Sequence, residues 1–406
     1  MIAFSLSGLD LPTFPSSSRD QRTMILSTLP LMVCIFWSAV LLLDLIATPA
    51  KLRMWLLAFM ATASFLYLGH AVFFAHLNAV IPFTDTLYCA CNLLVFPLYH
   101  LYLKGLCVPH YLNDTQQQRC DRLLLFHPAI LIALITGVLY LLMRDEEKNC
   151  FIETYLYHNR FAELSGWAFW QAVFHHVAKL LFALQVVVIA VSGWKHLRRY
   201  HSMIDNIYAD TDDKRLRRMQ TILILLVVGA VLAFVSNIIG RWRFADHPLI
   251  LAVPSLFFSA LLFMIGYVGS RQHFTANDLD EVTEELSEPL AQDSSQQLFS
   301  SLANKLEQLM NGEQLFLRHD LKIDEVARLL HTNRTYIQRA IANLSGESFT
   351  HYINRKRIEH ATRLMQEHPD YNMETISTLS GYAHIGTFYR NYKSITGKTP
   401  AKSLAH

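Results

Sequence analysis

Apolar runs long enough to cross a membrane follow one another through residues 24–270, and a mixed polar sequence follows them. The seven runs lie at residues 24–46, 54–77, 80–103, 123–143, 166–194, 219–240 and 249–269. A membrane-spanning helix needs roughly 20 apolar residues, because the hydrocarbon core is about 30 Å thick. The pattern therefore predicts an all-α chain in which a seven-helix transmembrane bundle at residues 24–270 precedes a soluble region.

Residues 321–400 carry two successive helix-turn-helix patterns. In the first, LKIDEVARLLHTNRTYIQRAI, the small Ala327 allows two helices to cross closely and Ile337 packs the second helix against the first. In the second, METISTLSGYAHIGTFYRNYK, Gly381 supplies a sharp turn, and Phe388 and Tyr392 form the buried face. Each pattern predicts a recognition helix whose other face is free to enter a major groove of double-stranded DNA.

Polar and basic side chains on these second helices suit the reading of base edges, because arginine matches guanine and amides match adenine. In the second unit we expect Thr387, Tyr389 and Arg390 to point outward. The predicted DNA-binding residues are Arg334, Thr335, Tyr336, Gln338, Arg339, His384, Ile385, Gly386, Thr387, Tyr389 and Arg390.

The stretches ESFTHYINRKRIEHATRL and ISTLSGYAHIGTFYRNYKSITGKTP resemble the AraC/XylS signature, in which a long helix bridges two helix-turn-helix units and a G-x-T-P element follows. The resemblance covers roughly residues 298–404, and two units at this separation are far more specific than one. It departs from the family at Ser377, where alanine is usual, and at His331, where glycine is frequent. It implies a sequence-specific transcriptional regulator, with RNA polymerase as a partner if the protein activates transcription.

The module at residues 298–406 has a small positive charge, since 14 Lys and Arg face 10 Asp and Glu, a net of +4. Non-specific DNA affinity should be modest, because each neutralised phosphate adds one increment of counterion release. Arg355, Lys356 and Arg357 fall on the bridging helix. They either contact phosphates or form a solvated face with an internal ion pair, and the resemblance favours a structural role for Arg357.

An acidic linker at residues 271–297, with seven acids against one arginine, joins the two parts. Its helical spacing of apolar residues suggests that the last span continues until Pro289 breaks it. A second stripe, Leu298, Leu302, Leu306 and Leu309, starts the module. One interpretation makes these stripes a homodimer seam, and the favoured alternative packs the second stripe on its own module, because three turns are too few to specify a coiled coil.

Basic residues in the loops indicate the orientation in a bacterial cytoplasmic membrane. One set of alternating loops carries 12: Lys51, Arg53, Lys104, Arg119, Arg122, Lys195, Arg198, Arg199, Lys214, Arg215, Arg217 and Arg218. The other set carries seven: Arg19, Arg22, Arg144, Lys148, Arg160, Arg241 and Arg243. Cytoplasmic loops hold the excess of Lys and Arg. We therefore expect residues 1–23 outside and the DNA-binding domain in the cytoplasm.

The membrane part exceeds what a tether needs, because one helix would anchor the module. The sequence lacks a G-x-S-x-G elbow, an H-E-x-x-H pair and a phosphate-binding glycine loop. Six cysteines form no C-x-x-C pair, and only Cys150 falls in a predicted outside loop, so we expect no structural disulfide. We predict a sensor that is not an enzyme and needs no cofactor. The alternative is an intramembrane enzyme or transporter with a fused autoregulatory DNA-binding domain.

Lys179 marks the predicted sensing site, because a charge near the middle of a span costs about 2.5–3.5 kcal/mol and needs compensation. His175 lies one turn away on the same face. With Asp85, Asn92 and Asn237 from other spans, these residues form the predicted pocket for a small-molecule or envelope signal. A structural pair of Lys179 with Asp85 is an alternative. A metal site built from His175 and the adjacent His176 is disfavoured, because neighbouring helix positions diverge by about 100 degrees.

Overall fold

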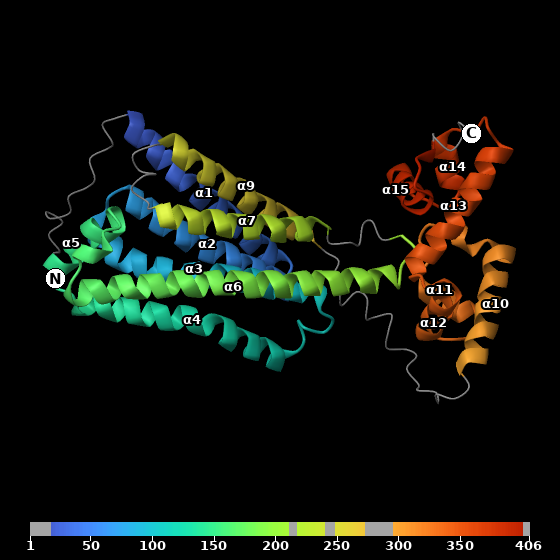
Figure 1. Cartoon of the computed structure of the whole chain (residues 1–406), viewed down its shortest axis with the longest axis horizontal. Helices are drawn as coiled ribbons and strands as arrows, with labels where there is room; N and C mark the ends of the chain where they lie inside the picture. Colours follow the sequence, from blue (N-terminus) through green and yellow to red (C-terminus); the bar gives the residue numbers. More distant parts are fainter. Residues whose placement is uncertain (1–17, 211–216, 240–247, 273–294, 401–406) are drawn as a thin grey trace. The chain divides into compact units, whose positions relative to one another are not determined.

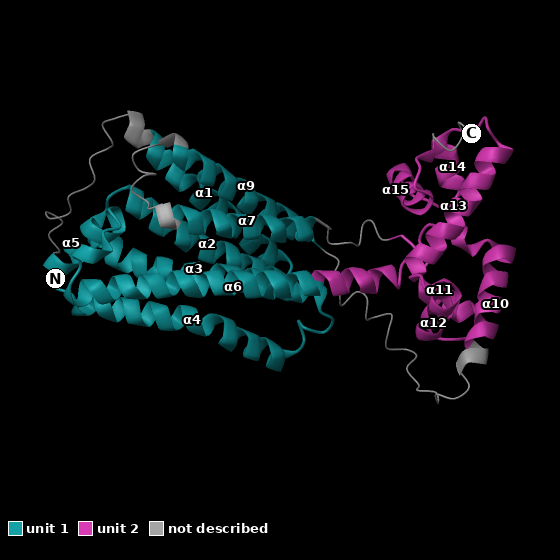
Figure 2. Ribbon diagram, in the orientation of Figure 1, with its two compact units in different colours: residues 1–196, 217–275 teal, residues 197–216, 276–406 magenta. Residues whose placement is uncertain are grey.

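The computed structural model describes residues 18–210, 217–239, 248–272 and 295–400. They divide into a bundle unit, residues 1–196 and 217–275, and a C-terminal unit, residues 197–216 and 276–406 (Figure 2). The linear domain boundaries expected from the sequence do not include this interleaving. Residues 197–216, which the sequence assigns to the membrane part, cluster with the C-terminal unit, and the division falls inside one helix.

Seven long helices build the bundle unit, and each coincides with a predicted span (Figure 1). They are α1 Ser18–Ala47, α2 Lys51–Phe74, α3 Ile81–Cys107, α4 Thr115–Leu142, α6 Gly166–Asp205, α7 Arg217–Ile239 and α9 Pro248–Ser270. All seven are long and apolar enough to cross a membrane. Helix α6 has 40 residues, so it runs well beyond the expected end at residue 194.

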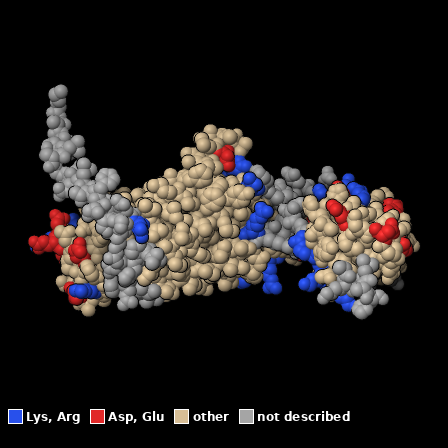
Figure 3. All heavy atoms as spheres, turned by 90° about the horizontal axis from the view of Figure 1, so that it is seen from above, with Lys and Arg blue, Asp and Glu red and all other residues tan. Residues whose placement is uncertain are grey.

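The bundle surface is apolar, the reverse of what a water-soluble protein shows. In the seven apolar windows only 28% to 44% of the residues are buried, while side chains such as Leu124 and Leu141 are 77% and 85% exposed. Extensive exposed apolar surface marks contact with lipid or with another protein. On the face shown in Figure 3, the charged side chains of this unit lie toward its two ends.

Inside the bundle, small residues allow close helix contacts. A Cβ atom on Gly266 of α9 would lie 2.4 Å from the Trp37 ring of α1, so this crossing requires glycine. Helices α3, α4, α6 and α7 meet in a second cluster around Leu93, Ala129, Ala178 and Ala230. Small side chains at such crossings are typical of helix packing in membranes, where backbones must approach closely.

The segment between α4 and α6 forms a packed cap, whereas the sequence predicts only a loop. It contains α5 Asp145–Cys150, the π-helix η2 Phe151–Tyr157 and the short η3 Phe161–Glu163. Phe151 and Ile152 are buried with Phe73 of α2 and Tyr140 of α4. The Tyr157 hydroxyl donates to Asn78 at 2.8 Å, just before α3, in the short helix η1 Asn78–Val80. The aromatic side chains of the cap thus pack it onto the ends of the neighbouring helices.

The C-terminal unit is also helical. Its elements are α10 Ser295–Glu313, η7 Leu315–Leu317, α11 Ile323–Leu329, α12 Arg334–Ser345, α13 Phe349–Glu367, α14 Met373–Leu379 and α15 Ile385–Thr396. Helix α10 packs on α12 through buried Phe299, Leu302 and Leu306. Leu302 and Leu306 of the second leucine stripe therefore pack on their own module, as the favoured interpretation expects, whereas the side chain of Leu298 lies outside the described residues. The predicted extension of the last span to Pro289 lies outside the described residues.

Candidate nucleic-acid interface and bundle pocket

The first helix-turn-helix unit consists of α11 and α12, as predicted. Ala327 and Ile337 are 3% and 0% exposed, so the small residue and the buried aliphatic residue sit where the helices meet. His331 in the turn has φ 50°, a left-handed conformation that histidine tolerates better than most residues. The side chain of Asn333 then caps α12 by accepting from the Tyr336 amide at 3.0 Å.

The second unit, α14 and α15, repeats the arrangement. Ser377 and Phe388 are 2% and 0% exposed, so serine fills the position where alanine is usual. Gly381 has φ 82°, and a Cβ atom there would lie 2.5 Å from the Leu317 carbonyl oxygen. Both the conformation and the space at this turn require glycine.

Arg357 lies on the bridging helix α13, inside the C-terminal unit. Its side chain is fully buried, and it donates to the carbonyl oxygens of Phe316 and Arg318, both at 2.6 Å. The structural role is confirmed, but the expected ion pair is wrong among the described residues. Main-chain carbonyls of the η7 turn are the nearer acceptors, and burial lowers the pKa of this arginine.

The two other basic residues of this stretch are bound to carboxylates. Lys356 contacts Glu307 at 2.7 Å, and Arg355 contacts Glu347 and Glu359 at 3.1 and 3.0 Å. Burial alone would raise the pKa of Glu307, but hydrogen bonds from Lys356 and Tyr352 outweigh it, and the pKa falls below its ordinary value. These pairs attach α13 to α10 and to its own N-terminal turn.

Several predicted DNA-binding side chains are exposed on the recognition helices. Thr335 and Arg339 are exposed on α12, and Arg334 beside them is half-buried, with its charge acting on Asp324 of α11. At the start of α15 the exposed residues are His384, Ile385, Gly386, Tyr389 and Arg390. Among these side chains, Arg339 lies over the Phe299 ring of α10, with its guanidinium carbon 5.8 Å from the ring centre.

Three predicted contact residues have partners within the unit instead. The Tyr336 ring packs on Phe299 of α10, with ring centroids 5.6 Å apart. Thr387 was expected to point outward, but it is only 6% exposed, because Arg390 reaches back across it and donates to its hydroxyl at 3.3 Å. Gln338 donates its amide to the Asn206 carbonyl at 3.3 Å.

Asn206 belongs to the segment 206–210, which directly continues α6 and is built into the C-terminal unit. Tyr208 pairs with Lys322 in an isolated bridge, where the Ala209 amide donates to Leu321 and the Ile323 amide donates to Ile207, both at 3.0 Å. Asn354 donates to the Ala209 carbonyl at 3.2 Å, and Thr350 donates to the Tyr208 carbonyl. The end of the fifth membrane-length helix thus binds both α11 and α13.

Sequence reasoning missed this segment. Its signal was an apolar group, Ile204, Ile207 and Tyr208, that follows a basic stretch in what otherwise reads as a polar loop. All three side chains are buried. Apolar residues in a short connecting loop need a partner surface, because otherwise they would stay in water.

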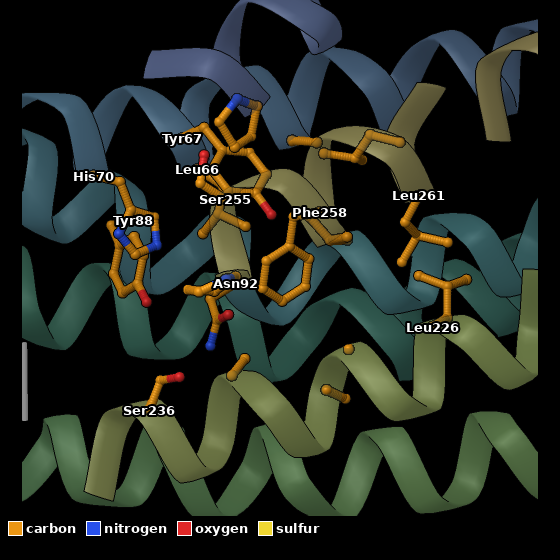
Figure 4. A pocket seen from close by; sticks show the side chains of 18 of the residues that line it. Leu66, Tyr67, His70, Tyr88, Asn92, Leu226, Ser236, Ser255, Phe258 and Leu261 are labelled. Atoms are coloured by element: carbon orange, nitrogen blue, oxygen red, sulfur yellow. The ribbon is translucent and has the colours of Figure 1, made fainter. Parts of the chain in front are cut away.

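The bundle unit contains a mostly apolar cavity of about 180 Å³ (Figure 4). Of the predicted pocket residues, Asn92 and Lys179 line it. Tyr67, His70 and Tyr88 also line it, and none of them was predicted from the sequence. His70 lies against both tyrosine rings, with centroids 5.7 Å from Tyr67 and 5.1 Å from Tyr88. The cavity therefore offers an apolar volume with a few polar groups, the usual composition of a ligand site.

Asp85 and His175 lie together at a different place, buried between α3, α4 and α6. His175 Nε2 is 2.8 Å from Asp85 Oδ2, and the Tyr140 hydroxyl donates to the same oxygen at 2.8 Å. Lys179 is half-buried, with its ammonium 5.8 Å from the centre of the Tyr155 ring. The side chain of Asn237 lies outside the described residues, so the five predicted residues separate into at least two groups.

Residues 326–405 match the model of a helix-turn-helix domain family. An uncharacterized HTH-type transcriptional regulator of Staphylococcus aureus is 28% identical over 97 residues, 24% of this chain and 13% of that relative. A counterpart from Staphylococcus aureus strain MRSA252 is 27% identical over 97 residues, with the same shares. The chain thus spans only 13% of the length of these relatives. No solved structure matches it. The C-terminal part is an AraC-type helix-turn-helix domain, and it follows seven helices of membrane length.

Proposed function

We propose that this chain is a membrane-embedded, sequence-specific DNA-binding transcription regulator, in which the bundle senses a signal and controls the AraC-type domain in the cytoplasm. The helix-turn-helix match and the exposed side chains on α12 and α15 support DNA binding. The apolar bundle surface supports a membrane location. The bundle acts as a receptor and not as an enzyme.

The observation that carries the proposal is the segment 206–210. A domain that was only tethered would need no contact between its recognition helix and the segment that continues α6. Here Asn206 holds Gln338 on the first recognition helix, and Tyr208 and Ala209 bind α11 and α13. A displacement of α6 therefore changes the surroundings of a residue predicted to read bases. In this proposal, segment 206–210 is the element that takes two arrangements, as control at a distance requires.

The bundle cavity is the proposed signal site. Its lining is mainly aromatic and aliphatic, and Lys179 brings a cation to one side of it. This combination suits an amphipathic small molecule with an apolar body and an anionic or hydrogen-bond-accepting group. Because the cavity is lined from α6 as well as from α2, α3 and α9, its occupant touches the helix that continues into segment 206–210.

The variant Tyr208→Ala tests whether segment 206–210 transmits the signal from the bundle to the DNA-binding domain. Removing a buried aromatic ring costs on the order of 3 kcal/mol at its site, so segment 206–210 should loosen from α11 while its main-chain bonds remain possible. We expect the purified variant to bind operator DNA, whereas transcript levels of bound genes no longer change between growth conditions. The bound genes come from a genome-wide map of occupied sites.

Ser202→Ala, at an exposed position on α6 six residues before Tyr208, is the matched control and should respond normally. Normal condition-dependent expression in Tyr208→Ala, at normal protein abundance, would exclude control through this segment. Absence of sequence-specific sites in the occupancy map would exclude the regulator itself.

A further inference from the structure

Asp85 and Cys89 of α3 and His175 of α6 bring three metal-ligating atoms together in the bundle. These atoms all lie within 4.8 Å of one another, and the three side chains are 6%, 4% and 6% exposed. His175 Nε2 is 2.8 Å from Asp85 Oδ2 and 3.5 Å from Cys89 Sγ. The cluster is separate from the residues that line the cavity described above.

The hydrogen bond on the far side of the imidazole fixes which nitrogen carries a proton. His175 Nδ1 is 2.9 Å from the Gln171 carbonyl oxygen, which can only accept, so Nδ1 is the donor. In a neutral imidazole, Nε2 then carries a lone pair, and this lone pair faces the carboxylate oxygen of Asp85. Two lone pairs do not approach to 2.8 Å without a cation between them. The cluster therefore holds a shared proton or takes a metal ion.

We propose that Asp85, Cys89 and His175 form a binding site for one divalent transition-metal ion of the zinc class. Carboxylate oxygen, thiolate sulfur and imidazole nitrogen are all zinc ligands. Around a tetrahedral ion with such bond lengths, neighbouring ligand atoms lie about 3.3–3.6 Å apart. The nitrogen-to-sulfur distance of 3.5 Å already fits, and the nitrogen-to-oxygen distance of 2.8 Å needs to lengthen by about half an ångström.

The surroundings supply the groups that orient metal ligands. The Gln171 carbonyl holds the imidazole, and the Tyr140 hydroxyl donates to Asp85, which are the contacts that typically surround ligating histidines and carboxylates. The Gln171 side chain is fully buried on the same face of α6, and neither amide atom has a hydrogen-bond partner among the described residues. In the proposed site, its oxygen or a water bound to it would complete the fourth position.

Charge balance favours exchange of protons for the ion in this apolar setting. The metal-free cluster is neutral when an imidazolium faces a carboxylate beside a thiol. Binding releases the shared proton and the Cys89 proton, and the divalent ion with one carboxylate and one thiolate is again neutral. The rings of Phe151 and Tyr155 from the cap lie 5.4 and 5.9 Å from the imidazole ring and shield the site.

Cobalt spectroscopy on the purified full-length protein in detergent tests the site, because a thiolate bound to Co²⁺ gives a charge-transfer absorption band that other ligands do not. We expect the band to saturate at one ion per chain and to disappear when Zn²⁺ is added. Cys89→Ala should lose the band. Cys91→Ala, an equally buried cysteine on the same helix outside the cluster, should keep it.

His175→Ala should weaken Co²⁺ affinity about tenfold or more. Adjacent and exposed His176→Ala should leave the affinity unchanged. Helix content and a single elution peak establish that each variant is folded. No charge-transfer band in folded wild-type protein would show that the cluster holds a proton only and would overturn the proposal, as would an undiminished band in Cys89→Ala. The readout needs neither DNA nor a signal, so the result does not depend on the proposed regulatory function.

Discussion

At the scale of the residue, the recognition helices separate side chains that the sequence pattern groups together. Thr335 and Arg339 are exposed on α12, whereas Tyr336 and Gln338 of the same helix contact Phe299 and Asn206. Helical periodicity identifies the face toward α11, because Ile337 must be buried there. It does not reveal that α10 and segment 206–210 cover the flanks of α12, since both contacts come from residues distant in sequence.

Arg339→Ala and Arg390→Ala should each weaken binding to operator DNA by about 1–3 kcal/mol, because an arginine on a guanine edge contributes that much discrimination. Both side chains are exposed on recognition helices. Titrations of full-length protein in nanodiscs with operator and random duplexes measure the effect. Arg363→Ala, an exposed arginine on the bridging helix, should affect the two duplexes alike. Equal losses on both duplexes for Arg339→Ala or Arg390→Ala would instead identify phosphate contacts.

Lys179→Met should separate sensing from stability, because methionine keeps much of the volume and removes the charge from the cavity. If Lys179 contacts the signal, the variant should insert, bind operator DNA in vitro and hold target-gene expression in one state under all growth conditions. Leu180→Met, at the neighbouring and 68% exposed position, should regulate normally. The measurement is reporter expression under different growth conditions, compared between the two variants at matched protein abundance. Wild-type responses in Lys179→Met would remove this lysine from the sensing site.

At the scale of the element, the sequence predicts what depends on local pattern. Seven apolar runs give seven helices, and Ala327, Ile337, Gly381 and Phe388 take the places that the two helix-turn-helix patterns assign to them. Each of these features depends on a window of about 20 residues, and within such a window the hydrophobic periodicity and the turn residues predict the structure. The same windows predict the leucine stripe of α10. They do not predict that α10 packs on α12, because this contact joins two separate elements.

The missed elements depend on distant contacts. The cap at 145–163 consists of helices that are too short to show as a periodic pattern in the sequence, and its buried aromatic residues pack on the ends of α2 and α4. Segment 206–210 also depends on distant contacts, because Tyr208 pairs with Lys322, more than 100 residues later. The predicted sensing residues separate for a related reason. One-dimensional spacing placed His175 and Lys179 on one face, but their neighbours on α3 divide them between a hydrogen-bonded cluster and the cavity.

At the scale of the whole molecule, the two ends of the bundle unit differ in charge. Lys51 at the start of α2, Lys104 near the end of α3 and Arg122 in the first turns of α4 lie toward one end, where Lys51 donates to the Leu112 carbonyl at 3.0 Å and Lys104 contacts Asp121 at 2.5 Å. Acidic Asp145, Glu146 and Glu147 lie in the cap on the segment that joins the far ends of α4 and α6. This polarity is what the positive-inside rule uses to orient helices, since Lys and Arg are retained in the cytoplasm.

The topology prediction follows from that asymmetry. A reporter fused after residue 150, in the cap, should be extracytoplasmic, and one fused after residue 205, at the end of α6, should be cytoplasmic. Alkaline phosphatase, active only outside, and a fluorescent protein, active only inside, give opposite signals at the two positions. The alternating loops carry 12 basic residues on the side of residue 205 and seven on the other. An inverted pattern would place the AraC-type domain away from DNA. The exposed arginines of α12 and α15 would then have no double helix to read, and the proposed regulator would fail at its first requirement.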